Sequence, residues 1–167
     1  MGHWHVNPSL YIHPAAPKLS LGGPDRDEKI DRLEAEMRSM GQDSGEVGIE
    51  ILHHFAPGIY AREMRVPAGR LITSKVHKFE NLSILSRGRM VLYQDDGTVV
   101  EVVAGMHVVA PAGARRVAWV IEDSVWTVFH ATTNTNPDEI EAQVVAPSRA
   151  EYLKFSAAAE KELSWAG

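Results

Sequence analysis

The chain has 167 residues, which suits one domain with a sizeable core plus some appended structure. Hydrophobic residues make up 44% of the chain, and no stretch approaches the roughly 18 consecutive apolar residues of a membrane span. The chain contains no cysteine, which excludes disulfides and thiolate metal sites, and its net charge of −5 without a dense basic patch argues against nucleic acid as a partner.

Residues 1–46 are expected to form an extended arm followed by one helix. The first residues lack the charged and then apolar pattern of a secretory signal, so we expect a cytoplasmic protein. Proline and glycine recur through residues 1–24 and favour an irregular, extended chain. This arm also carries several apolar side chains, which predict that part of it lies across the rest of the chain or across a partner subunit: Trp4, Leu10, Tyr11, Ile12, Leu19 and Leu21.

Residues 24–41 carry the clearest helical pattern. Pro24 and Asp25 stand at its start and Gly41 at its end, and acidic residues crowd the first turn. Apolar residues recur at spacings of three and four and form one narrow seam: Ile30, Leu33, Met37 and Met40. The seam fits two arrangements, packing on the chain's own sheet or pairing with the same helix of a second subunit.

Residues 47–132 change to short apolar runs that are separated by turn residues. Asp95-Asp96-Gly97 is a good hairpin turn, and Pro-Gly pairs mark other breaks. Many short strands without an intervening helix predict an all-β antiparallel sandwich or barrel. The expected strands are 48–54, 58–66, 70–76, 82–86, 89–94, 98–103, 106–110, 115–121 and 124–131.

Residues 133–167 are expected to form a short helical tail. Asn136-Pro137-Asp138 predicts the start of one helix, and Ser148 can cap a second one that reaches about Leu163. We expect these helices to cover an exposed face or edge of the sheet.

Two segments of the strand-rich region, residues 67–88 and 105–119, resemble the two sequence motifs of the cupin family, a small β-barrel superfold. The matching positions are Gly69, His77 and Gly88 in the first segment and Gly105, Pro111 and Gly113 in the second. The resemblance implies a cupin-type antiparallel jelly-roll barrel over residues 47–132. Lys75, Asn81 and Arg116 stand where cupins usually have metal ligands, so the resemblance implies a degenerate metal site.

Three longer stretches are similar to a group of small cupins encoded by bacteriophages and prophages: residues 53–69, 75–90 and 122–133. That similarity implies a homodimer, and for a phage-encoded chain it implies the cytoplasm of the bacterial host. It implies no agreed reaction.

The resemblance also implies that Lys75, His77, Asn81 and Arg116 point into the mouth of the barrel. Two cations beside imidazole and amide groups suit a carboxylate or phosphate, and an arginine can bind such a group in a bidentate fork. Tyr93 and Trp126 could then pack against a ring or a sugar of the ligand. We therefore expect an anionic small molecule to be bound by these residues together with His130.

Two further functions stay open. A metal-dependent enzyme, an oxygenase, isomerase or hydrolase, requires His77 and His130 to converge with His53 or His54 on a divalent transition metal. Otherwise the barrel could be only a structural platform for dimerisation, as the long arm and the helical flanks suggest. The sequence does not decide whether the protein is an enzyme.

Overall fold

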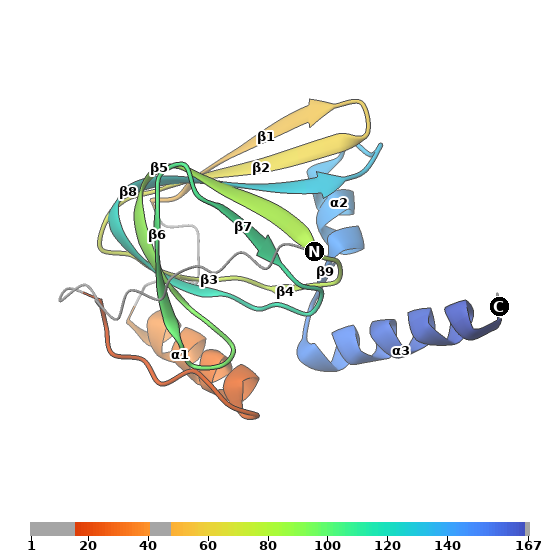
Figure 1. The fold of residues 1–167 in the computed structure, drawn as a ribbon, viewed down its shortest axis with the longest axis horizontal. Helices are drawn as coiled ribbons and strands as arrows, with labels where there is room; N and C mark the ends of the chain where they lie inside the picture. The colour runs from red at the N-terminus through yellow and green to blue at the C-terminus, as the bar shows by residue number, and fades with distance from the viewer. Residues whose placement is uncertain (1–15, 41–47, 166–167) are drawn as a thin grey trace.

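The computed structural model of the protein describes residues 16–40 and 48–165, with side chains described up to residue 161. The part described is mostly antiparallel β-sheet with three helices, and the expectation of an all-β core with helical flanks is confirmed at this level (Figure 1). The helices are α1 (Arg26–Ser39), α2 (Pro137–Val144) and α3 (Arg149–Trp165). The strands are β1 (Glu50–Ala56), β2 (Ile59–Val66), β3 (Leu71–Thr73), β4 (Val76–His77), β5 (Asn81–Tyr93), β6 (Val99–Val103), β7 (His107–Ala110), β8 (Val117–Ala131) and β9 (Val145–Ala146).

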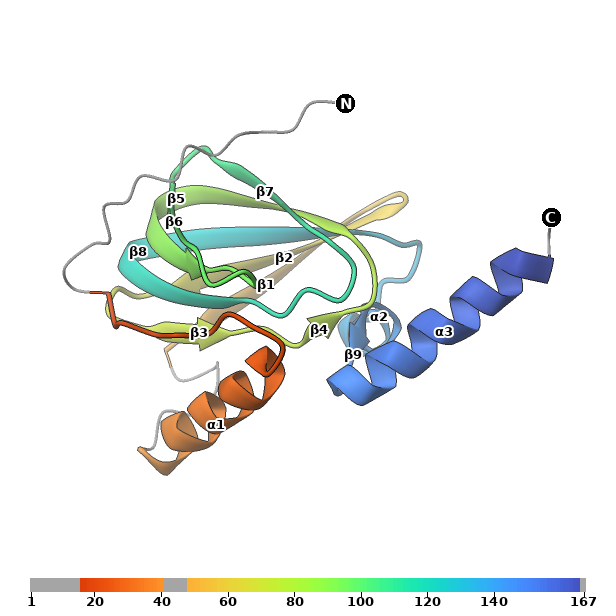
Figure 2. The same cartoon turned by 60° about the horizontal axis from the view of Figure 1, so that its bottom comes forward.

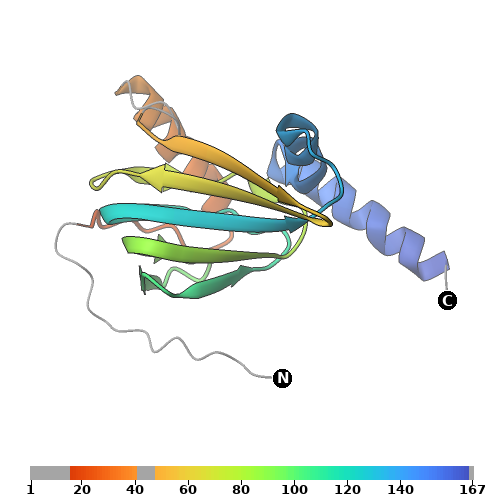
Figure 3. The ribbon, with the colours of Figure 1, turned by 90° about the horizontal axis from the view of Figure 1, so that it is seen from above.

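Seven strands form one sheet in the order β1-β2-β8-β5-β6, with β3 paired to β8 and β7 paired to β5. The first half of β5 pairs with the second half of β8, and its second half pairs with the first half of β8. Because both strands bend in the middle, the sheet folds over and its two halves face each other across a barrel-like interior (Figures 1 and 3). The remaining two strands, β4 and β9, pair separately at one end of this interior.

The bend explains why two pairs of expected strands are single strands. The register of β5 on β8 shifts between Leu85 and Met90, an irregularity of the β-bulge type, so residues 87–89 continue one strand instead of separating two. Gly88 has φ of 86° and lies directly against β8. A Cβ atom added there would stand 2.4 Å from Ser124 Oγ, so the close crossing of the two strands requires glycine.

The sheet buries both of its faces. Toward the interior, Leu85, Val120 and Trp126 belong to one apolar cluster that fills much of the barrel. On the opposite face, Val91 and Val117 pack against the arm and α1. The central strands β5 and β8 therefore lie between two apolar layers.

Helix α1 packs on its own sheet, which decides between the two arrangements of its apolar seam (Figure 2). Ile30 is fully buried and Met37 nearly so, whereas Met40 is 61% exposed. Leu21 of the arm is buried beside Ile30, so the expectation that part of the arm lies across the sheet is confirmed for its described end. Trp4, Leu10, Tyr11 and Ile12, as well as Gly41, lie outside the described residues.

Two arginines fasten α1 to the sheet. Arg26 donates hydrogen bonds to the carbonyls of Leu21, Tyr93, Gln94 and Arg115, and its Nε lies 2.8 Å from Asp95 Oδ1 in an ion pair without hydrogen-bond geometry. Arg115, which precedes β8, pairs with carboxylates of α1: Asp27, Asp31 and Glu34. The helix is thus held by charge as well as by its apolar seam.

The C-terminal tail begins as expected and adds one strand that the sequence did not indicate. The Asn136 side chain accepts hydrogen bonds from two backbone amides of the first turn of α2, and Ser148 Oγ accepts one from Glu151 N. Helix α2 buries Ile140 against Tyr60 of the sheet, and β9 follows it directly. Helix α3 touches the body near its start, while its remainder points away (Figures 1 and 2). Among the described helices, none has the length and apolar character that a bilayer crossing requires.

The burial of Ile30 predicts how strongly α1 stabilises the fold. Ile30→Ala should lower the free energy of unfolding by about 2–5 kcal/mol, because it leaves a cavity under a fully buried side chain. Met40→Ala, at the exposed end of the same seam, should change it by less than about 0.5 kcal/mol. Urea unfolding followed by circular dichroism measures both values. Equal effects of the two substitutions would contradict the docking of α1 described here.

Candidate functional site

The backbone of His77 is held from two sides at the end of the barrel interior. Its N–H donates to the carbonyl of Ala114 at 3.1 Å, and its carbonyl accepts from Gly113 N at 2.7 Å. On the other side, β4 pairs with β9, so that His77 lies opposite Val145. The loop of the second sequence motif and the C-terminal tail therefore place this imidazole together.

His77 is one end of a row of four stacked rings that crosses β4, β8, β2 and β1. The rings of His77 and His130 are 5.9 Å apart and inclined by 20°. His130 lies directly opposite Tyr60 on the neighbouring strand, with ring centroids 6.3 Å apart. Tyr60 stacks in turn on His53 at 5.8 Å, and its hydroxyl forms a 2.7 Å hydrogen bond with His53 Nδ1. The row brings together His77 and His130, which are far apart in the sequence.

His77 and His130, the two histidines of the row that lie toward the barrel interior, are neutral at physiological pH. Burial, with smaller contributions from His130, Arg116 and Arg62, lowers the pKa of His77 to about 4. Burial and the charge of Arg62 also lower the pKa of His130. Nδ1 of His77 is buried and has no hydrogen-bond partner among the described residues. An unsatisfied buried ring nitrogen of this kind is costly unless a further group binds it.

Arg116 lies near enough to His77 for its charge to act on that imidazole, and no described carboxylate is in contact with its guanidinium; Asp95 acts on it only at longer range. Its guanidinium stands over the ring of Trp126, 5.8 Å from the centroid, and Trp126 is itself buried in the interior cluster. Burial lowers the pKa of Arg116 to about 10, which leaves it charged at neutral pH. Within the described part of the chain, the guanidinium forms no ion pair and no hydrogen bond. Only its backbone is tied down, by two 2.8 Å hydrogen bonds with Ser74.

Arg62 is a second cation near His77, and no motif position in the sequence pointed to it. It lies on β2 opposite Val128, on the face that also carries Tyr60 and Met64. Its charge acts on both His77 and His130. Like Arg116, it has no ion-pair or hydrogen-bond partner among the residues that the structure describes. Strand alternation from Tyr60 was the signal that could have found it.

Asn81 lies in the interior, as expected, together with Ser83 and Leu85 on alternate positions of β5. Asn81 is 6% exposed; its amide donates a long 3.4 Å hydrogen bond to the carbonyl of Phe79 and accepts one from Ser83 Oγ. The amide is therefore a buried polar group with weak internal partners.

Two of the expected ligand-binding residues lie elsewhere. Lys75 is exposed and pairs with Glu141 of α2, because the chain leaves the strand geometry between β3 and β4 and its alternation does not continue to His77. Tyr93 is buried on the outer face, where its hydroxyl donates a 2.6 Å hydrogen bond to the carbonyl of Pro17. Lys75 therefore does not point into the barrel mouth, and Tyr93 does not face the interior, where it could pack against a ligand.

The residues present do not fit the three-ligand metal site considered from the sequence. His53 is separated from His130 by the ring of Tyr60, and His54 pairs with Glu63 at 3.2 Å. In the described part of the chain, no group of three or more His, Asp or Glu side chains is arranged to hold a metal. Two cations instead adjoin the His77–His130 pair.

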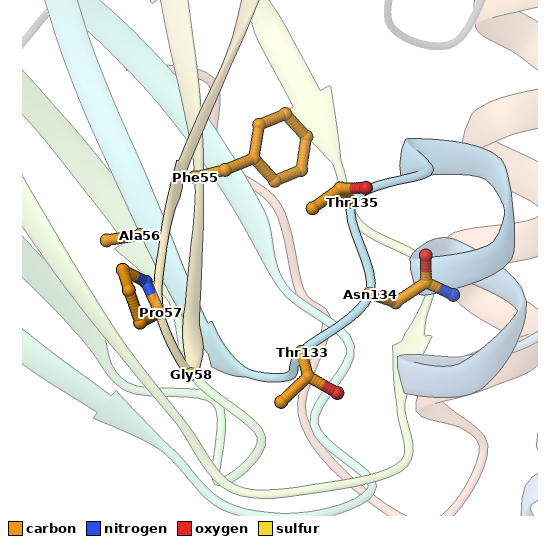
Figure 4. Close-up of a pocket in the computed structure, with 7 residues that line it drawn as sticks. All are labelled: Phe55, Ala56, Pro57, Gly58, Thr133, Asn134 and Thr135. Carbon is orange, nitrogen blue, oxygen red and sulfur yellow. The ribbon is translucent and has the colours of Figure 1, made fainter.

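An open hollow of about 400 Å³ lies next to the outer end of the ring row (Figure 4). It is lined by the turn between β1 and β2 and by residues 133–135 after β8. Phe55 forms one wall and also stacks on Tyr60 at 5.3 Å. The lining residues carry no charged side chain, so the hollow offers no counterpart for an anion.

Comparison with known proteins gives solved structures but no sequence relative. No family model matches the chain, and no curated protein sequence matches it. KdgF from Halomonas sp. is 17% identical over 57% of this chain and 87% of that protein, with a TM-score of 0.47. EutQ from Clostridium difficile is 13% identical over 56% and 76%, with a TM-score of 0.43. The Cupin_2 domain of an XRE family transcriptional regulator from Enterobacter cloacae is 9% identical over 53% and 100%, with a TM-score of 0.45. The similar structures thus include cupin domains, and at these values they carry no conclusion about ligand or reaction.

The low pKa of His77 predicts a loss of stability in acid. The unfolded chain takes up this proton at about pH 6.5 and the folded protein only at about pH 4, so stability is complete above about pH 6.5 and falls as the pH drops to about 4. Over this pH window, His77 alone should lower the free energy of unfolding by about 3 kcal/mol. Urea unfolding between these pH values should show a correspondingly smaller loss for His77→Phe than for the unsubstituted protein.

The matched control for this experiment is His107→Phe. His107 is exposed on β7, and its replacement should leave the dependence of stability on pH unchanged. If His77→Phe retained the full acid loss, His77 would not be held neutral in the folded protein.

Proposed function

We propose that the protein is a cupin-type jelly-roll protein that binds an anionic small molecule, bearing a carboxylate or phosphate, at the His77 end of the barrel interior. The observation that carries the proposal is Arg116, a half-buried and charged guanidinium that no described carboxylate contacts, near His77 with its unsatisfied Nδ1. A buried charge is expensive unless an opposite charge and hydrogen bonds compensate it. An anionic ligand supplies both.

The surrounding groups support the same chemistry. His77, His130 and Asn81 offer neutral donors and acceptors, and the Trp126 ring under Arg116 provides an apolar floor. Hydrogen bonds from an arginine to a carboxylate or phosphate are about twice as strong as those between neutral groups. The low dielectric of a half-buried site increases this advantage further.

We also propose that the protein is phage-encoded and forms a homodimer. Both proposals rest only on the similarity to phage-encoded small cupins, a group without an agreed reaction. Light scattering coupled to size-exclusion chromatography measures the oligomeric state directly.

The role of Arg116 in binding is tested with three simple anions, inorganic phosphate, succinate and butyrate. The protein should bind at least one of them in isothermal titration calorimetry, and Arg116→Gln should weaken that binding roughly tenfold or more, since it removes a charged hydrogen-bond donor. Lys75→Gln is the matched control: Lys75 is exposed and paired with Glu141, so its loss should leave the affinity within about twofold.

Near-ultraviolet circular dichroism checks that each variant is folded. Failure of all three anions to bind to the folded protein would overturn the proposed function. Equal weakening by Arg116→Gln and Lys75→Gln would place the binding site elsewhere.

A further inference from the structure

Several carboxylates of the surrounding elements are already paired with other cations. Glu141 of α2 pairs with Lys75, Glu63 of β2 pairs with Arg65 and His54, and Asp95 pairs with Arg26. In the described part of the chain, Arg62 and Arg116 form no ion pair, and Asp95, which Arg26 already holds, acts on Arg116 only at longer range. Both arginines therefore lack a carboxylate in contact with them.

The two arginines approach the same stretch of β8 from different elements. Arg116 stands over Trp126, and Arg62 lies on β2 opposite Val128. His77 experiences the charge of both guanidinium groups. Both arginines thus adjoin the interior face of β8, on the side where His77 lies.

Because His77 and His130 are neutral, the positive charge of the site comes from its arginines. His77 and His130 add hydrogen-bonding groups but no positive charge at neutral pH, because burial opposes their protonation. The remaining charge is that of the two guanidinium groups. A ligand with a single negative charge would leave one of them half-buried and uncompensated, which is the costly arrangement.

Building on the proposed function, we infer that the ligand presents two negative charges, as a phosphate monoester or a dicarboxylate does, and that Arg62 and Arg116 each neutralise one of them. This assignment makes Arg62 a specificity-determining residue. It decides between dianions and monoanions, whereas Arg116 is required for either.

Sulfate and methyl sulfate test this inference, because they share one tetrahedral anionic group, differ by one charge, and do not titrate between about pH 5 and about pH 8. Isothermal titration of the full-length protein at low ionic strength should show sulfate binding roughly tenfold or more tightly than methyl sulfate. Arg62→Gln should reduce that preference to about twofold or less while it leaves methyl sulfate binding nearly unchanged. Arg116→Gln should weaken both anions.

Arg65→Gln is the control for Arg62→Gln, since Arg65 lies on the same strand but is exposed and paired with Glu63 and Glu50. It should retain the full preference for sulfate. Equal affinity for the two anions in the unsubstituted protein, or a preference that persists in folded Arg62→Gln, would overturn the two-charge assignment and leave the proposed function standing. Binding of neither anion, nor of the anions tested for the proposed function, would overturn both.

Discussion

β5 and β8 pair with each other in both halves of the sheet, and the other elements are arranged around this pair. Both strands bend where Gly88 crosses Ser124, and that contact excludes any larger residue. Without the bend, the sheet would be open and its two halves would not enclose an interior. The bend therefore creates the cluster around Leu85 and Trp126, and it leaves one end of the interior free for polar groups.

At that polar end, the fold accepts an energetic cost that it avoids elsewhere. Arg26 and Arg115 are also buried, but each is surrounded by carbonyls or carboxylates. Arg62 and Arg116 have no such partners among the described residues. Two half-buried guanidinium groups without a contacting carboxylate are unfavourable for stability, and packing in the rest of the molecule must offset this. Proteins commonly place destabilising arrangements of this kind where they bind something.

Much of this arrangement could be predicted from the sequence, and the errors have definite physical causes. The motif positions indicated His77, Asn81 and Arg116, and all three side chains are buried or half-buried in the structure. Tyr93 faces outward, because the register shift between Leu85 and Met90 exchanges the two faces of β5. Lys75 is exposed because the chain leaves the strand at residues 74–75. Strand β9 was missed because two residues carry no pattern. Arg62 and the exposed Arg65 are the same residue type on one strand, so the sequence does not tell them apart. Only the pairing of Tyr60 with His130 shows which face of β2 is the inner one.

Arg115 and Arg116 are neighbours in the chain but serve opposite sides of the sheet. Arg115 forms ion pairs with three carboxylates of α1, and the guanidinium of Arg116 stands over the Trp126 ring in the interior. The peptide between them joins the outer layer mechanically to the interior. If α1 were detached, the segment before β8 would lose the ion pairs of Arg115 and would be positioned only from the other side, by Ser74 and His77. A shortened form of the protein that starts at β1 is thus not a neutral substitute for the whole chain.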